Sequence, residues 1–187
     1  RQIGIGISMY ADDFEGRLPQ TAHETFSTNK IWIRKILPYV GNSEAIRLCP
    51  AYPTRIERRD NGGTSYIWNE FVSVPVIDSF GQILAPLPKL DQLRQPTETI
   101  LLFEVADEYG PSVFSDHTHS RSWLRSGWAG VIADIQPDRH RAGASNPDST
   151  EGRANYLFVD GHVESIDARE FKRQIDQGIN VAQPPEF

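Results

Sequence analysis

The sequence predicts an α+β fold, and three segments carry that prediction. Residues 155–166 contain two β-favouring runs around an Asp-Gly dipeptide, which is typical of a tight β-hairpin turn. Residues 96–106 hold a four-residue apolar run, Ile-Leu-Leu-Phe, bounded by Pro and acidic residues, as expected of a central strand. Residues 168–177 have the caps and apolar spacing of a closing helix. Together they predict helices packed on an antiparallel sheet with long loops.

Length and composition favour a single globular domain over residues 1–187. An apolar fraction of 39% is enough for a buried core. A net charge of −6 and the lack of a basic stripe argue against a nucleic-acid-binding protein. Cys49 is the only cysteine, so it forms no internal disulfide, and we expect it to be a small buried residue rather than a nucleophile. The chain begins with Arg1 rather than Met, so we expect it to be a trimmed or processed product.

The first fifteen residues fit two structures. Ile3, Ile5 and Ile7 alternate as in a strand, and two glycines each disfavour a helix by about 1 kcal/mol relative to Ala. A helix would instead place one apolar stripe on a single face, made of Ile3, Ile7, Tyr10 and Phe14.

The middle of the chain gives weaker signals. Thr28-Asn29 can cap a helix over residues 30–40, whose last turn Pro38 would weaken. The charged segment from Arg55 to Gly63 is expected to be a solvated loop. Irregular strands are predicted over residues 71–77 and 127–134, with the polar segment 107–126 as a loop before the second of them.

The Asp160-Gly161 turn predicts a pairing register for the hairpin. A two-residue turn pairs Val159 with His162, so that Phe158 opposes Val163. Phe158 and Val163 are therefore expected on the core side.

The same stretch resembles a known family. An Arg-His pair, a small-residue segment and Ala-Asn-Tyr-Leu-Phe-Val-Asp-Gly-His-Val are similar to the C-terminal H-X9-DG signature of prepilin-type, type II secretion pseudopilin-like proteins. The matching residues are His140, Asp160 and Gly161, with nineteen residues between His140 and Asp160 where the family has nine. The surplus, residues 144–153, is polar and is expected to be an inserted surface loop.

Other segments resemble the family in the same order along the chain. They are Gln-Ile-Gly…Tyr-Ala-Asp-Asp…Gly…Leu-Pro over residues 2–19, Cys49-Pro50, Tyr66…Asn69 and Pro-Thr-Glu-Thr-Ile-Leu-Leu from Pro96. The resemblance implies that residues 1–15 are the end of a long N-terminal helix, closed at Gly16. It implies a pilin-like fold, with this truncated helix packed on the antiparallel sheet.

Function follows from that resemblance as an expectation. The family implies a structural subunit of a type II secretion pseudopilus or a related filament, similar to the major pseudopilin, with no enzymatic activity. Its precursor would carry a leader cut by prepilin peptidase and an apolar helix, absent here, that anchors it to the periplasmic face of the inner membrane or the cell surface. Its partners would be copies of itself, other pseudopilins and the inner-membrane secretion machinery.

Several side chains suggest other chemistry. His140 could hydrogen-bond Asp160 and so fix the loop to the hairpin turn, and the same imidazole–carboxylate pair could bind a metal or act as acid and base. His117 and His119 have the His-x-His spacing that can share a zinc ion, although no third His or Cys lies at a typical offset, so a solvated loop is the simpler interpretation.

The inserted loop offers a calcium hypothesis. Asn146, Asp148 and Glu151 supply hard oxygen donors, and major pseudopilins commonly carry calcium near this end of the sheet, although no EF-hand spacing is present. No other cofactor is expected.

Trp123 and Trp128 are open to two interpretations. They could form an aromatic platform for a sugar or a secreted cargo, or they could anchor a long loop onto the body of the domain. Two alternatives to the filament subunit therefore stay open. One is a carbohydrate- or cargo-binding module of the same fold, and the other is a metal-dependent hydrolase that uses His117 and His119.

Overall fold

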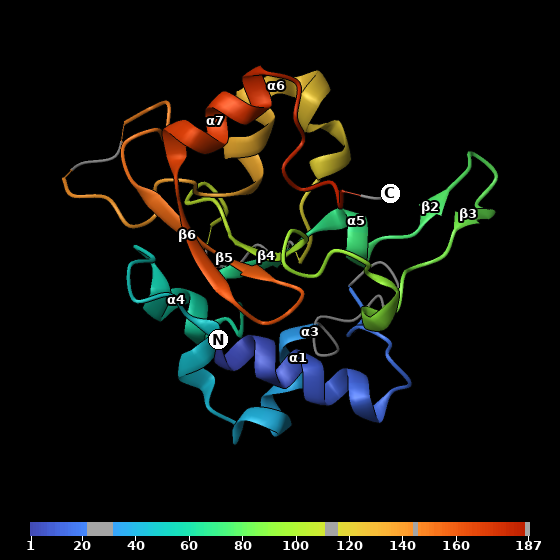
Figure 1. Cartoon of the computed structure of the whole chain (residues 1–187). Helices are drawn as coiled ribbons and strands as arrows, with labels where there is room; N and C mark the ends of the chain where they lie inside the picture. The colour runs from blue at the N-terminus through green and yellow to red at the C-terminus, as the bar shows by residue number, and fades with distance from the viewer. Residues whose placement is uncertain (22–31, 111–115, 144–145, 186–187) are drawn as a thin grey trace.

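The computed structural model describes residues 1–21, 32–110, 116–143 and 146–185, and it has the predicted α+β architecture. A four-stranded antiparallel sheet has the strand order β1-β4-β5-β6, and β2 and β3 form a separate two-stranded arm that projects from the body (Figure 1). The helices are α1 (Gln2–Asp13), α3 (Trp32–Ile36), α4 (Arg55–Asp60), α5 (Glu70–Ser73), α6 (Trp123–Asp134) and α7 (Ala168–Asp176). The strands are β1 (Tyr66–Trp68), β2 (Val76–Ile77), β3 (Ile83–Ala85), β4 (Ile100–Glu104), β5 (Arg153–Phe158) and β6 (Val163–Asp167). Short 3-10 helices are η2 (Leu37–Val40), η3 (Glu44–Arg47), η4 (Leu90–Gln92) and η5 (Ser120–Ser122).

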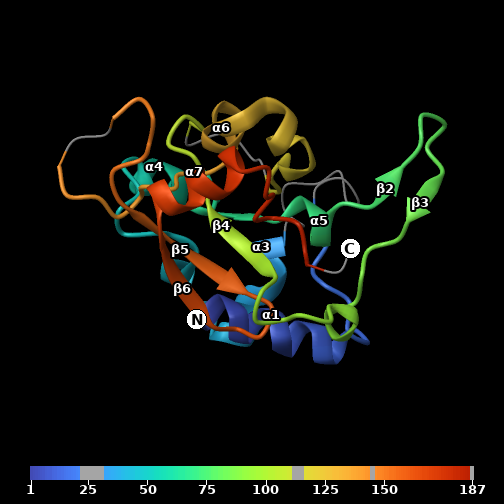
Figure 2. The ribbon, with the colours of Figure 1, turned by 45° about the horizontal axis from the view of Figure 1, so that its top comes forward.

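The four-stranded sheet lies between two helical layers. Helices α1 and α3 lie on one face, and α6 and α7 lie on the other (Figures 1 and 2). Each face has its own hydrophobic cluster, because successive residues of β5 point to opposite faces. Tyr156 and Phe158 belong to the cluster under α6 and α7, whereas Leu157 belongs to the cluster over α1.

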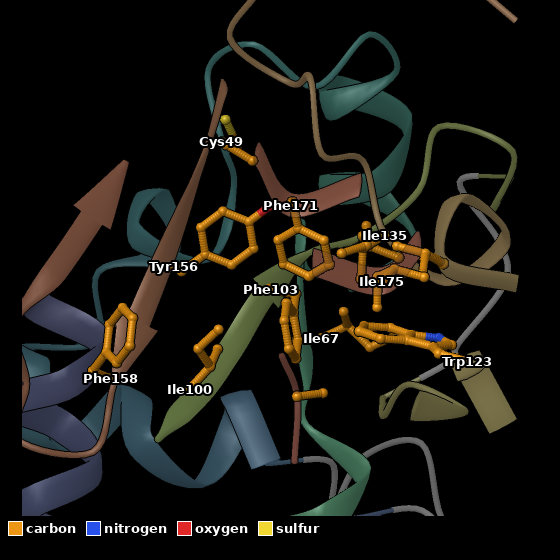
Figure 3. Packing of buried hydrophobic residues seen from close by; sticks show 14 of the residues in the cluster. Cys49, Ile67, Ile100, Phe103, Trp123, Ile135, Tyr156, Phe158, Phe171 and Ile175 are labelled. Atoms are coloured by element: carbon orange, nitrogen blue, oxygen red, sulfur yellow. The ribbon is translucent and has the colours of Figure 1, made fainter. Parts of the chain in front are cut away.

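Aromatic side chains fill the first cluster (Figure 3). Tyr156 stacks on Phe171 of α7 with ring centroids 5.4 Å apart, and Phe103 meets Tyr156 edge to face at 5.8 Å. Trp123 of α6 completes the group and is fully buried. These contacts fix α6 and α7 against the sheet.

The N-terminal segment is helical, as the family resemblance implies. Ile3, Ile7 and Tyr10 are each at most 8% exposed and pack against the sheet. The fourth residue of the predicted stripe, Phe14, follows the end of α1 and is 47% exposed, so its predicted burial is wrong, although its ring stacks on Tyr10 at 4.2 Å. The chain leaves the helix through Gly16, which has a φ of 83°.

The hairpin exists, but its predicted register is wrong by one residue. Leu157, not Phe158, pairs with Val163, and the loop holds three residues instead of two. The amide of Gly161 donates to the Phe158 carbonyl at 3.0 Å, and Gly161 has a φ of 84°, which is the type I turn with a glycine bulge. Phe158 is buried as predicted, whereas Val163 is 37% exposed on the outer strand.

Three segments differ from their predicted structure. Residues 55–60 form helix α4 rather than a loop, because Arg58 is buried and donates to the Thr64 carbonyl at 2.7 Å. The segment predicted as a strand over 71–77 is divided between α5 and the short strand β2. Of residues 127–134, Gly127 forms a kink in α6 with a φ of 65° and a ψ of −158°, and the rest form its second half, because a short apolar run fits a buried helix as well as a strand.

Other predicted elements are confirmed. Strand β4 is buried along its whole length, and α7 is capped by the Asp167 carboxylate, which accepts from the Arg169 amide at 2.9 Å. The helix predicted over 30–40 is present as α3, which begins at Trp32, followed by the 3-10 helix η2, which contains Pro38. Its predicted cap, Thr28-Asn29, lies outside the described residues. In the described part of the chain, no helix has the length and apolar character that a membrane span requires.

Candidate functional site

His140 is part of a cluster at one end of the sheet, and its predicted bond to Asp160 is absent. Its backbone amide donates to the Arg153 carbonyl at 2.7 Å, which places it beside the start of β5, whereas Asp160 follows the end of that strand. The Asp160 carboxylate instead accepts from the backbone amide of His162 at 3.0 Å, and its Oδ1 lies 2.6 Å from Nδ1 of the same residue. The His140–Asp160 pair is therefore not a site.

Three other side chains surround the His140 imidazole. Its Nε2 lies 3.1 Å from the Glu104 carboxylate, 2.8 Å from Asn155 Nδ2 and 3.9 Å from Cys49 Sγ. Glu104 is the last residue of β4 and is 2% exposed. Its second carboxylate oxygen accepts from the backbone amide of Asn155 at 2.9 Å. Cys49 is also 2% exposed, whereas the His140 side chain is 36% exposed and opens the cluster to solvent.

The Cys49 thiol is poorly suited to nucleophilic catalysis. Burial, and then the neighbouring Glu104 carboxylate, raise its pKa to about 12, so the thiol stays protonated at neutral pH. Burial likewise raises the pKa of the nearby Tyr66 phenol, with further contributions from Cys49 and Glu104. The geometry therefore fits ligand binding or a structural role better than a cysteine–histidine nucleophile.

Cys49 and Glu104 were not predicted as site residues. Each has an ordinary local explanation, the first as a small core residue and the second as the polar end of a strand. The sequence signals near this cluster were two parts of the family resemblance, His140 and Cys49-Pro50.

His117 and His119 do not form a shared metal site with a third ligand among the described residues. His117 Nδ1 lies 3.0 Å from the Asp116 carboxylate, and His119 Nδ1 lies 2.9 Å from the Asp134 carboxylate. Asp134 also accepts from the His119 amide and from Trp123 Nε1, both at 2.7 Å. In these contacts the two imidazoles have separate carboxylate partners. Asp134, the last residue of α6, ties the segment around His119 to that helix.

At the calcium candidates, no group of three or more His, Cys, Asp or Glu ligands is found in the described part of the chain. Asn146 accepts from the Thr150 amide at 3.2 Å within the loop, and Glu151 lies 3.9 Å from Arg169. The backbone carbonyl of Asp148 accepts from Trp128 Nε1 at 2.6 Å.

The two tryptophans have anchoring roles. Trp123 has no exposed surface, so it offers no platform to a ligand. Trp128 is half-buried, and its ring lies 6.3 Å from that of Phe171 and 6.0 Å from the Lys172 ammonium. Together with its bond to the Asp148 carbonyl, these contacts make Trp128 a link between α6, α7 and the loop that contains Asp148.

Comparison with protein-family models, curated proteins and solved structures finds no match to this chain.

Proposed function

We propose that this protein is a structural subunit of a type II secretion pseudopilus or a related pilin-like filament, and not an enzyme. The observation that carries the proposal is the position of α1. One side of this helix seats on the antiparallel sheet through Ile3 and Ile7, as the family resemblance leads one to expect of a pilin-like subunit. The other side exposes Ile5 and Met9, at 58% and 45%.

A helix that is apolar on both sides suits a filament subunit. The inward side holds the domain, and the outward Ile5 and Met9 offer apolar area to the helix of a neighbouring subunit. In this proposal α1 is the end of a longer apolar helix that anchors the protein at the periplasmic face of the inner membrane or at the cell surface. The partners are copies of the same chain, other pseudopilins and the secretion machinery.

The β2–β3 arm supplies a second apolar surface for subunit contacts. Ile77, Phe80, Ile83 and Leu84 are 57%, 92%, 59% and 63% exposed, and exposed apolar groups of this kind mark protein interaction sites. Asp78 is the only charged residue from 76 to 85.

A groove elsewhere on the domain suits this arm. It has a volume of about 720 Å³, and its apolar lining includes Tyr10, Phe14, Leu87 and Pro88. Three cations, Arg17, Lys35 and Lys89, also line it and are opposite in charge to Asp78 of the arm. An arm of one copy in the groove of the next is a head-to-tail contact, which generates an open helical array when the rotation between copies does not close a ring.

The processing of the native protein tests the pilin-like identity. We expect protein recovered from cell envelopes to begin with a methylated residue followed by about 20 apolar residues, as N-terminal sequencing and intact mass will show. The matched control is the same protein from cells without prepilin peptidase, which should retain its leader. A conventional cleaved signal peptide that ends close to Arg1 would refute the proposal.

Disulfide trapping tests the arm contact separately. Phe80→Cys combined with Leu87→Cys should form ladders of cross-linked copies in envelopes. The control combines Phe80→Cys with Ile56→Cys, because Ile56 is 56% exposed on α4 and does not line the groove. Equal ladders from both pairs would exclude this contact while leaving the processing test intact.

A further inference from the structure

The cluster around His140 gathers a sulfur, a carboxylate oxygen and an amide at one ring nitrogen. A ring nitrogen carries either one proton or one lone pair in its plane, so it either donates or accepts. His140 Nε2 faces the Glu104 carboxylate, which needs a donor, and Asn155 Nδ2, which is itself a donor. Cys49 Sγ approaches the same nitrogen at 3.9 Å. A proton on Nε2 can serve the carboxylate but not the sulfur, whereas a cation between these groups would take sulfur, oxygen and nitrogen as ligands together.

We propose that Cys49, Glu104 and His140 bind a divalent transition-metal ion, with zinc as the first choice. Their ligand atoms all lie within 4.8 Å of one another. Bonds of about 2.3 Å to sulfur and about 2.0–2.2 Å to nitrogen and oxygen place the ligands of a tetrahedral zinc ion roughly 3–4 Å apart. The Sγ–Nε2 and Nε2–Oε1 separations of 3.9 and 3.1 Å match that spacing before any adjustment.

The donor set selects the kind of metal. Calcium and magnesium take oxygen ligands, whereas a thiolate with an imidazole and a carboxylate suits zinc. A thiolate and a carboxylate would also neutralise the two positive charges of the ion. Among the described residues, His140 is the only ion-pair partner recorded for the buried Glu104 carboxylate.

Asn155 adjoins the position of a fourth ligand. Turning its side-chain amide over would place Oδ1 about where Nδ2 now lies, 2.8 Å from His140 Nε2. Either this oxygen or a water molecule completes a tetrahedral site. The 36% exposure of the His140 side chain leaves the ion a route from solvent.

Bound metal would join three segments that are distant in sequence. Cys49 follows η3, Glu104 ends β4, and His140 opens the segment that leads to β5. The ion, rather than the predicted His140–Asp160 bond, would thus hold the segment that begins at His140 against the sheet. Because a preformed site binds only the folded chain, saturating zinc at 100 times its Kd should raise the Tm by roughly 5–10 °C.

Cobalt titration of the purified, EDTA-treated protein tests the proposal. We expect one Co²⁺ per chain and the thiolate-to-cobalt charge-transfer absorption of a sulfur ligand, with zinc displacing the cobalt. Cys49→Ser should abolish this absorption, and His140→Gln should raise the Kd at least about 100-fold, since even the loss of an outer partner costs 10–100-fold. His162→Gln is the matched control, because its side chain is 35% exposed against 36% for His140, and it should bind like the unmodified protein.

Two outcomes would overturn the site. One is cobalt binding without the charge-transfer absorption, and the other is an equal loss of affinity in His140→Gln and His162→Gln. Circular dichroism checks that each variant folds. If Cys49→Ser does not fold, the comparison of His140→Gln with His162→Gln decides the test. The result does not depend on the filament proposal, because the titration is indifferent to N-terminal processing.

Discussion

Replacing Ile7 by Ala should reduce the free energy of unfolding by about 2–5 kcal/mol, the usual cost of truncating a buried Ile. Ile7 is 1% exposed and belongs to the cluster between α1 and the sheet, so truncating it leaves a cavity in a packed cluster. The same change at Ile5 is the matched control. Ile5 is 58% exposed on the same helix, and Ala is the better helix former by a few tenths of a kcal/mol, so this variant should be neutral or slightly more stable.

Urea unfolding followed by tryptophan fluorescence measures both variants, because Trp32 and Trp68 lie in the same cluster as Ile7. Each kcal/mol should also lower the Tm by roughly 2–4 °C in a chain of this size. Equal losses of stability in the Ile5 and Ile7 variants would refute the packing of a helix on the sheet, because the alternation of a strand puts both residues on one face. A loss below about 1 kcal/mol at Ile7 would mean that α1 is not packed on the sheet.

Asp134→Ala should lower the free energy of unfolding by roughly 2–5 kcal/mol in the same assay, because it leaves the His119 backbone amide and the buried Trp123 Nε1 without their acceptor. The exposed control Asp148→Ala should change it by no more than about 0.5 kcal/mol. Equal effects of the two variants would contradict the role of Asp134 as an acceptor. Gly161→Ala should cost about 1–2 kcal/mol for its positive φ alone, since nothing lies within 4 Å of an added Cβ. Gly161→Asn should cost less because Asn tolerates this conformation, and an equal cost for both variants would exclude the turn geometry as its cause.

Local signals predicted the elements whose ends depend on nearby residues. The cap of α7 at Asp167 and the turn at Asp160-Gly161 follow from their own neighbours in sequence. The register of the hairpin does not, because Asp-Gly fits both a two-residue turn and the three-residue turn with a bulge. Burial of both faces of β5 then favours the observed turn, since Phe158 and Leu157 each have a hydrophobic cluster to enter.

Helix α6 shows a second limit of local reasoning. Its apolar residues fit a strand or a helix equally well, and the choice depends on contacts distant in sequence. Trp123 must enter the aromatic cluster while its Nε1 donates to Asp134, eleven residues later. Both requirements are met because α6 is kinked at Gly127, which has a φ of 65° and a ψ of −158°, whereas a continuous helix would hold Trp123 and Asp134 about 16 Å apart. No window of sequence contains the sheet that imposes these requirements.

The cluster of Cys49, Glu104 and His140 depends on strand register more than on any motif. The pairing of Leu102 with Leu157 brings the end of β4 level with the start of β5, where the His140 amide bonds the Arg153 carbonyl. A one-residue slip between β4 and β5 would turn Glu104 to the opposite face and separate it from His140. The register that buries the apolar residues of both faces therefore also assembles the three ligand types, so a variant that lost metal binding through such a slip would lose core packing as well.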